Sequence, residues 1–429
     1  MHQVDFNLSL EEITKVEGHA RLDITVRGGK VVQTQFQILE YKRFYTQAIR
    51  GQAIMGVPQL LARICGTCSN AHLMASIEAI EHGLGIIPSP QTMALRRLTV
   101  NGLIIRDHAL HLYLFVMPDL FNRDSLLQFD EKNPEEHEIL HDAFAVKSAG
   151  NHLSMLVAGR SVHAPYPTIG GFLHTPEKKD IPAVVEELQK VRPAVLRLID
   201  LFMNRRFVFE RKTQYVALLS DTYGYLEGEL HNSKGVVIPE QNLREHLEHV
   251  VVPYSEASAY IFEGEMYRVG ALSRMNLAKE KLHPATKRDA NGAISIFPSD
   301  NVHDMNLAQA IEILQAIDES LDVLKTEFLP EMPQKPVYRE SVGIGVVEAP
   351  RGVLFHKLYL TADGKVREGE VIVPTGQNQI PIERDIAHLV EENITMEHAA
   401  LSHEIEKLIR AYDPCMSCAA HFLEVNWLS

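Results

Sequence analysis

Basic residues and long apolar runs are scarce in this sequence of 429 residues. Lysine and arginine number 42 against 56 aspartates and glutamates, so the formal net charge is −14. An acidic surface repels phosphate backbones and anionic lipids, which argues against nucleic-acid binding and membrane-surface binding. No apolar run reaches the roughly 18 residues of a membrane span, and the N-terminus lacks a charged-then-apolar signal pattern. We therefore expect a soluble, cytoplasmic chain with no direct membrane span.

Cysteine is equally scarce, with only Cys65, Cys68, Cys415 and Cys418. They form two CxxC pairs separated by nearly the whole chain. A disulfide framework is a poor expectation for so large a chain of cytoplasmic character, and metal binding is the better one. From spacing alone, a structural zinc site and a four-cysteine iron–sulfur cluster stand equal. A redox CxxC needs only one pair and usually a βαβ context.

The hydrophobic periodicity indicates a mainly helical chain. The segment 20–39 alternates apolar and polar residues on both sides of two glycines and predicts a β-hairpin. Strand-like runs return over 338–375, and the polar, turn-rich segment 283–303 predicts a surface loop. Helical patterns cover 91–117, 135–160, 181–205, 304–328 and 381–411. Because no linker or repeat divides the chain, we expect one α+β domain over 1–429, a bundle of long helices with a peripheral β-hairpin and small sheets.

The residues around the cysteines carry more information than their spacing. RICGTCSNAH (63–72) and DPCMSCAAH (413–421) resemble the two metal motifs of nickel–iron hydrogenase large subunits. Further segments resemble that family's motifs in the same order along the chain: TKVEGHARL (14–22), LEYKRF (39–44), HALHLYLFVMPD (108–119), GRSVHAPYPTIGGF (159–172), YRVGALSRMN (267–276), EAPRG (348–352) and VIVPTGQN (371–378). The resemblance therefore spans the chain, and it implies the fold of those subunits.

The resemblance also implies an activity, the reversible heterolytic cleavage of H₂ into protons and electrons. It implies that Cys65 and Cys415 are terminal nickel ligands, and that Cys68 and Cys418 bridge nickel to an iron that also carries carbon monoxide and cyanide. Soft thiolates suit this chemistry, because H₂ is barely polarised and its cleavage needs a soft, electron-rich metal.

Five further residues are expected to surround the metals by the same resemblance. Arg351 would lie over them, oriented by a charge-assisted bond from Asp119. Thr375 would donate a hydrogen bond to a cyanide, flanked by Pro350 and Pro374.

Four residues are expected to move a proton, orient a ligand or hold a second metal. Glu17 would take the proton away, if burial raises its pKa toward neutrality. His72 would orient the site from behind the ligands rather than bind metal itself. Glu40, together with His421 near the C-terminus, resembles the ligands of a second site that usually holds magnesium. Alternatively, Glu40 forms a salt bridge with one of the two basic residues that follow it, Lys42 or Arg43.

The cysteine count also predicts a partner. Iron–sulfur clusters normally need cysteines, and all four here are already assigned. We therefore expect an iron–sulfur small subunit to receive the electrons, with further electron-transfer subunits in a cytoplasmic, cofactor-coupled assembly. The resemblance also implies removal of the tail FLEVNWLS (422–429) after His421. Two alternatives remain: a complex I-type quinone-site subunit, which lacks the cysteine pairs, and a zinc-stapled scaffold without catalysis.

Overall fold

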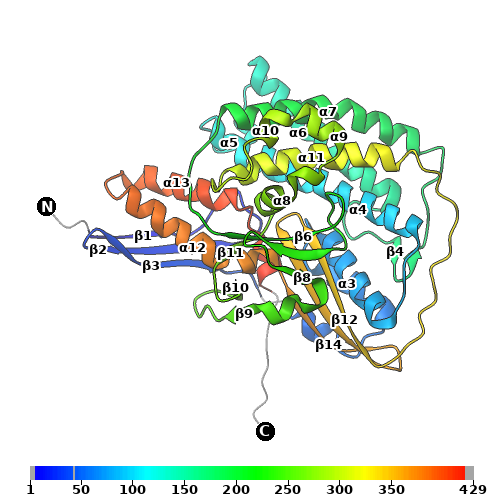
Figure 1. The fold of residues 1–429 in the computed structure, drawn as a ribbon. Helices are drawn as coiled ribbons and strands as arrows, with labels where there is room; N and C mark the ends of the chain where they lie inside the picture. The colour runs from blue at the N-terminus through cyan, green and yellow to red at the C-terminus, as the bar shows by residue number, and fades with distance from the viewer. Residues whose placement is uncertain (1–4, 42–43, 421–429) are drawn as a thin grey trace, which may run out of the picture.

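The structure is a computed structural model that describes residues 5–41 and 44–420. Four long helices form the upper layer of Figure 1, and small sheets lie below them. These helices pack against one another, and they are α4 (Pro90–Ala109), α6 (Pro134–Ala158), α7 (Ile181–Asn204) and α11 (Asp304–Val323). The expected α+β architecture with a long-helix bundle is confirmed, and each of the four helices falls on a helical pattern in the sequence.

Helix ends follow the local chemistry of the chain. The Ser89 hydroxyl caps α4 by accepting a hydrogen bond from the Thr92 N–H at 3.0 Å. The predicted helix 91–117 does not stop at its proline, because α4 continues through a π-helical segment, η3 (Leu110–Val116), into the short α5 (Met117–Leu120). A proline in the first turn of α5 is tolerated, since its missing N–H is not needed there.

Two sequence predictions about helices are wrong. The pattern over 381–411 is two helices, α12 (Pro374–Glu392) and α13 (His398–Ala411). The chain restarts because the Glu397 carboxylate caps the N-terminus of α13. The segment 283–303 is not only a loop, since it contains α9 (Pro284–Asp289) and α10 (Asn291–Ile294).

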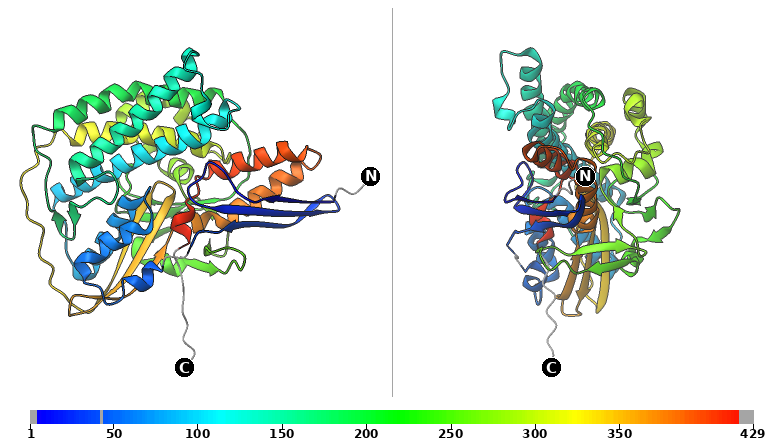
Figure 2. Two further views of the ribbon diagram at one scale, coloured as in Figure 1. Left: turned by 180° about the vertical axis from the view of Figure 1, so that it is seen from behind. Right: turned by 90° about the vertical axis from the view of Figure 1, so that its left-hand side faces the viewer.

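The predicted hairpin is confirmed and extended. β2 (Ala20–Arg27) and β3 (Lys30–Ile38) pair antiparallel around the two glycines, and β1 (Phe6–Leu10) adds a third strand. This sheet projects from the molecule as a long arm, with α12 and α13 beside it (Figures 1 and 2).

A second antiparallel sheet contains β12 (Ser341–Ala349), β13 (Gly352–Leu360) and β14 (Val366–Ile372). It packs on α3 (Ser69–Leu84), the helix that follows the first cysteine pair. The contact needs glycine, because a Cβ at Gly343 or Gly345 would lie 1.7 Å or 2.2 Å from a carbonyl oxygen of α3. The backbone of α3 therefore rests directly on β12.

Short strands complete the fold. A four-stranded sheet contains β6 (Gln214–Leu219), β7 (Glu229–Asn232), β8 (Val237–Pro239) and β11 (Tyr267–Arg268). One two-stranded sheet pairs β9 (Leu247–Val250) with β10 (Ala259–Phe262), and another pairs β4 (Pro167–Thr168) with β5 (Gly171–Phe172). Among the described residues, no helix combines the length and the apolar character that crossing a lipid bilayer requires.

Candidate metal centre

The fold brings the two cysteine pairs together. Cys68 immediately precedes α3, and Cys415 immediately precedes the short helix α14 (Met416–Ala419). All four cysteines are buried free thiols, and their sulfurs lie within 4.8 Å of one another. Sγ–Sγ distances are 3.4 Å for Cys65 and Cys415, 3.0 Å for Cys68 and Cys418, and 2.9 Å for Cys415 and Cys418. The expected convergence of the pairs on one site is therefore confirmed.

The electrostatics of the four sulfurs fit a bound cation. Hydrogen bonds from neighbouring thiols hold the pKa of Cys65 well below its usual range. Burial raises the pKa of Cys415 and of Cys418 well above it, because a second and third negative charge cannot be solvated there. Four converging sulfurs are a donor set for soft metals, and the positive charge of such metals is what allows all four thiols to ionise.

Backbone contacts tie three distant segments together at this site. The Met416 N–H donates to the Glu17 carbonyl at 2.9 Å, joining the N-terminal segment to the second cysteine pair. The Cys415 N–H donates to the Thr375 hydroxyl oxygen at 2.9 Å, joining the first turn of α12. The buried Thr375 hydroxyl accepts here and keeps its own hydrogen free to donate.

The Glu17 side chain lies against a cysteine. The Cys415 thiol is 3.0 Å from Glu17 Oε2, and the Ser417 N–H donates to the same oxygen at 3.1 Å. Burial raises the pKa of Glu17, and the charge of Cys65 raises it further. A carboxyl group in this position can exchange a proton with a cysteine sulfur.

Arg351 occupies the turn between β12 and β13, where Ala349 pairs with Gly352 and leaves two residues to reverse the chain. The guanidinium is buried, and each of its three nitrogens makes one hydrogen bond. Its Nε donates to the Asp413 carbonyl at 2.7 Å, and its two Nη atoms donate to Asp107 Oδ2 and Asp413 Oδ1, each at 2.8 Å. The attraction of Asp107 and Asp413, and next of Cys415, outweighs burial and holds its pKa well above the usual value.

The expectation that Asp119 orients Arg351 is wrong. Asp119 accepts two hydrogen bonds from Arg410, at 2.7 and 3.1 Å, and pairs with Lys15 at 2.7 Å. Asp107, which lies twelve residues earlier on the same helical path, takes the expected place.

Arg106 is a second guanidinium at the site that the sequence reasoning missed. Its Nη2 donates to the Thr67 carbonyl at 2.7 Å, inside the first CxxC loop, while its buried Nε has no hydrogen-bond partner. Burial lowers its pKa, against the attraction of Asp107 and of the cysteines. The sequence held a signal for each of these missed residues. Arg106 and Asp107 form an Arg-Asp pair within the apolar run NGLIIRDHAL, and Asp413 lies at the start of the second cysteine motif, DPCMSCAAH.

His72 lies between the cysteines and the sheet. Its Nε2 is 3.7 Å from the Cys418 sulfur, and its Nδ1 is 3.1 Å from Nε2 of His356 on β13. Burial lowers the pKa of His72 to about 4, so the imidazole is neutral near pH 7.

A buried ion network supports the turn that carries Arg351. Arg274 donates to both carboxylate oxygens of Glu312 at 2.6 and 2.7 Å, to Glu348 at 2.6 Å, and to the Pro350 carbonyl at 3.0 Å. Burial opposes ionisation of Glu312, but Arg274 outweighs it and lowers the pKa of Glu312 to about 2. Pro350 and Pro374 are both buried, the first in this turn and the second at the start of α12.

The expected second metal site is only partly described. Glu40 Oε1 accepts a hydrogen bond from the His19 N–H at 2.9 Å. His421, the tail 422–429 and both basic residues expected as alternative partners of Glu40 lie outside the described residues. The magnesium site therefore stays a prediction.

Comparison with known proteins places this geometry in a family. The model of the nickel-dependent hydrogenases matches residues 44–157 and 221–421. Sulfhydrogenase 2 subunit alpha of Pyrococcus furiosus is 32% identical over 423 residues, which cover 97% of this chain and 100% of the relative. Sulfhydrogenase 1 subunit alpha of the same organism is 29% identical over 426 residues, covering 97% and 98%.

The fold agrees with this assignment. The crystal structure of an NAD⁺-reducing NiFe hydrogenase in the H₂-reduced state matches with a TM-score of 0.85 at 22% identity, over 97% of this chain and 99% of that one. At this identity the likeness shows the fold, and it confirms the large-subunit fold expected from the sequence. With the family match over most of its length and four converging buried cysteines, the chain belongs to the nickel-dependent hydrogenases, as the catalytic subunit of a nickel–iron hydrogenase.

Proposed function

We propose that H₂ is cleaved at the four-cysteine site and that Cys415 and Glu17 carry the resulting proton away. When bound, a nickel–iron pair supplies a soft, redox-active Lewis acid that polarises H₂ and accepts its two electrons. The observation that carries the proposal is the convergence of four buried sulfurs within 4.8 Å. Cys65 and Cys415 would hold nickel alone, while Cys68 and Cys418 would bridge nickel and iron.

The proton path begins on a sulfur. A protonated Cys415 thiol can donate directly to Glu17 Oε2, 3.0 Å away. The raised pKa of Glu17 suits this role, because a carboxylate with a pKa nearer neutrality takes up the proton more readily. Its half-buried position leaves a route for the proton toward solvent.

The residues around the metals would exclude water from the site and keep its polar groups in fixed orientations. Asp107 and Asp413 hold the Arg351 guanidinium in one orientation, so that its charge faces the site without a mobile counter-ion. We propose that the free Thr375 hydroxyl hydrogen donates to a cyanide on iron, while Pro350 and Pro374 add no N–H donors. His72 would fix the position of Cys418 as a neutral imidazole. Carbon monoxide would be a further ligand of the iron.

Electrons must leave through another chain. The four cysteines are all used, and an iron–sulfur relay needs further thiolates. The relatives are named as alpha subunits, which supports an assembly of several subunits. We propose an iron–sulfur small subunit docked at the site, further electron-transfer subunits behind it, a cytoplasmic location, and magnesium bound by Glu40 and His421.

Metal analysis combined with single cysteine variants tests the assignment. Cys65→Ala, Cys68→Ala, Cys415→Ala and Cys418→Ala should each abolish H₂-dependent dye reduction and lower the nickel content. Zinc as the only metal in folded wild-type protein would instead favour a zinc-stapled scaffold without catalysis. A cysteine variant that retains normal nickel content and turnover would refute the proposed ligand set.

The C-terminal tail has its own test. We propose removal of residues 422–429 after His421 once the metals are inserted, because the second cysteine pair must stay accessible until then. Intact mass spectrometry of active, nickel-loaded enzyme should show a chain that ends at His421. Full activity in a chain whose mass still includes residues 422–429 would mean that the tail belongs to the mature enzyme.

A further inference from the structure

A second group of metal-binding side chains lies at the other end of α3. Glu78 and His82 are four residues apart, so they share one face of the helix. Glu240 faces them from the first position of η5 (Glu240–His246), and the ligand atoms of the three residues lie within 4.8 Å of one another. Glu78 follows Cys68 by ten residues, roughly 15 Å along the helix, so this group is separate from the four cysteines.

The two carboxylates are buried without enough partners. Glu78 is 8% exposed and Glu240 is 6% exposed, and the Oε2 atom of each is buried with no hydrogen-bond partner. Buried polar atoms are rarely left in this state, because their lost hydration is not replaced by a hydrogen bond, and the cost is larger for a charged group. Two buried carboxylates that lie this close together, each with an unpartnered oxygen, are suited to binding a cation.

Neighbouring side chains do not pair with these two oxygens, since the His82 imidazole approaches Glu240 at its other oxygen, Oε1. Arg96 is the adjacent guanidinium, and it is committed to Glu81 through two hydrogen bonds of 2.7 and 2.6 Å. Glu227 adds a further negative charge, which acts on both buried carboxylates. Burial raises the pKa of Glu78 and of Glu240, and Glu227 raises both further, as expected for two buried carboxylates that lack a cation.

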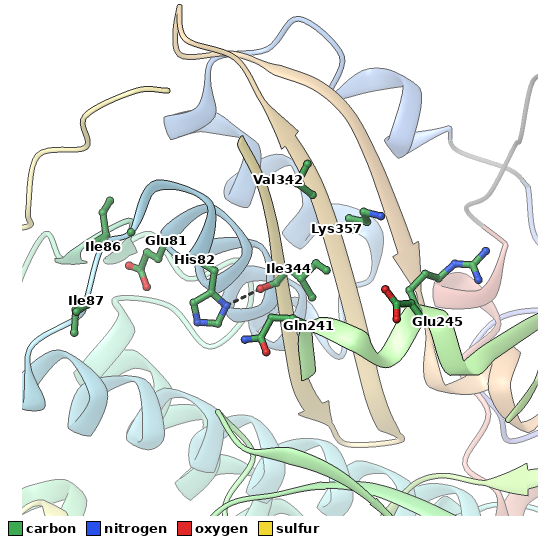
Figure 3. Close-up of a pocket in the computed structure, with 11 residues that line it drawn as sticks. Glu81, His82, Ile86, Ile87, Gln241, Glu245, Val342, Ile344 and Lys357 are labelled. Atoms are coloured by element: carbon green, nitrogen blue, oxygen red, sulfur yellow. Dashed lines mark hydrogen bonds between the residues drawn. The ribbon is translucent and has the colours of Figure 1, made fainter. Parts of the chain in front are cut away.

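His82 is held between β12 and Glu240 through one ring nitrogen. Its Nδ1 lies 2.7 Å from the Ile344 carbonyl oxygen of β12, drawn as the dashed line in Figure 3, and 3.4 Å from Oε1 of Glu240. Histidines that bind metal through one nitrogen commonly donate from the other to a backbone carbonyl. The imidazole lines a pocket of about 670 Å³ between α3, η5 and β12, with Gln241 beside it, whereas Glu78 and Glu240 do not line that pocket.

We propose that Glu78, His82 and Glu240 bind one divalent transition-metal ion of the zinc or manganese class. One imidazole nitrogen and two carboxylates match that class, whereas an all-oxygen set would favour magnesium or calcium. The ion neutralises the two carboxylates and joins α3 to η5, the segment that leads into β9. The site is structural, and it fastens the far end of the helix whose near end carries Cys68.

Manganese titration of the chelator-dialysed full chain, purified with its natural partners, tests the site. The EPR signal of free Mn²⁺ gives the number bound, and thiolates compete poorly for this ion. We expect the wild type to bind one more Mn²⁺ per chain than Glu78→Gln/Glu240→Gln. Glu245→Gln, an exposed glutamate of the same pocket outside the triad, is the matched control and should bind as the wild type does.

His82→Ala guards against loss of the fold in the double variant. Its side chain is 38% exposed, so truncation should leave the circular dichroism spectrum unchanged. We expect it to weaken the Kd of this site at least about 10-fold, as loss of metal-site residues does. Equal Mn²⁺ binding by wild type and His82→Ala would overturn the proposal. So would an unchanged Mn²⁺ count accompanied by a higher Tm in a folded Glu78→Gln/Glu240→Gln, which would mean that the carboxylates share a proton instead.

Discussion

Replacement of Glu17 by glutamine separates proton transfer from every other function of the metal centre. Glutamine has the length and shape of glutamate, and its side-chain oxygen can still accept the Ser417 N–H that Glu17 accepts at 3.1 Å. It cannot take a proton from the Cys415 thiol, which lies 3.0 Å from the carboxylate oxygen. The variant therefore keeps the packing and loses the base.

The expected loss follows from that single contact. A positioned general base contributes about 10²–10⁴-fold to rate, equivalent to about 3–5 kcal/mol in the barrier at 1.36 kcal/mol per decade. We expect Glu17→Gln to lower hydrogen–deuterium exchange between H₂ and D₂O by this factor. Nickel content and Tm should stay at wild-type values.

The pH profile gives a second readout. The pKa of Glu17 is raised, so in the wild type the exchange rate should fall as the pH drops through a value above the ordinary 4.5 of a glutamate, because a protonated carboxyl cannot accept another proton. Glu17→Gln should lack this acidic limb. The control is Glu12→Gln, an exposed glutamate of the same segment, which should match the wild type. Exchange within threefold of wild type in a metal-loaded Glu17→Gln would refute the proton path.

Three further predictions concern the surroundings of the metals. Arg351→Lys should retain nickel but lose about 10²-fold in kcat, because a lysine cannot satisfy both of its aspartates while facing the site; unchanged turnover would count against an oriented charge. Gly345→Ala should lower stability by about 1–3 kcal/mol in thermal unfolding through overpacking, since its Cβ would lie 2.2 Å from the Ala75 carbonyl oxygen, whereas Val342→Ala on the exposed part of β12 should change little. The pKa of Glu312 is lowered from 4.5 to about 2, which stabilises the fold by about 3 kcal/mol above pH 4.5 and is lost as the pH falls toward 2. Glu312→Gln should therefore be less stable than the wild type in urea at pH 7, and the gap should narrow at pH 3.

Sequence motifs predicted the site better than they predicted its contacts. The cysteine pairs could be chosen because cysteine is rare in this chain, whereas Glu17 and Arg351 could be chosen through the family resemblance of their segments. The choice between two acids on one helical path could not be made, since Asp107 and Asp119 differ only in how far along it they lie. No sequence pattern indicates which of these two aspartates the Arg351 turn will contact.

Periodicity failed where burial was complete or where a cap was decisive. Almost every residue of α3 is buried. Its sequence therefore lacks the alternation of apolar and polar faces by which a surface helix is recognised. The division between α12 and α13 depends on one capping carboxylate, Glu397, within an otherwise helical pattern. Both features arise from tertiary packing or from single hydrogen bonds, which a window of average hydrophobicity does not resolve.

The separation of the cysteine pairs makes the metal centre a late event in folding. Cys65 and Cys415 are 350 residues apart in sequence, and closing a loop of that length costs about 5 kcal/mol of chain entropy by the logarithmic rule. Two hydrogen bonds, from the Met416 N–H to the Glu17 carbonyl and from the Cys415 N–H to the Thr375 hydroxyl, offset part of this entropy cost. They can form only after the N-terminal arm and α12 are in place. A chain truncated during synthesis or trapped with one misplaced segment cannot assemble the four sulfurs. Assembly of the complete thiolate set therefore requires that the N-terminal segment, α3, α12 and the C-terminal cysteine pair of one chain have all come together.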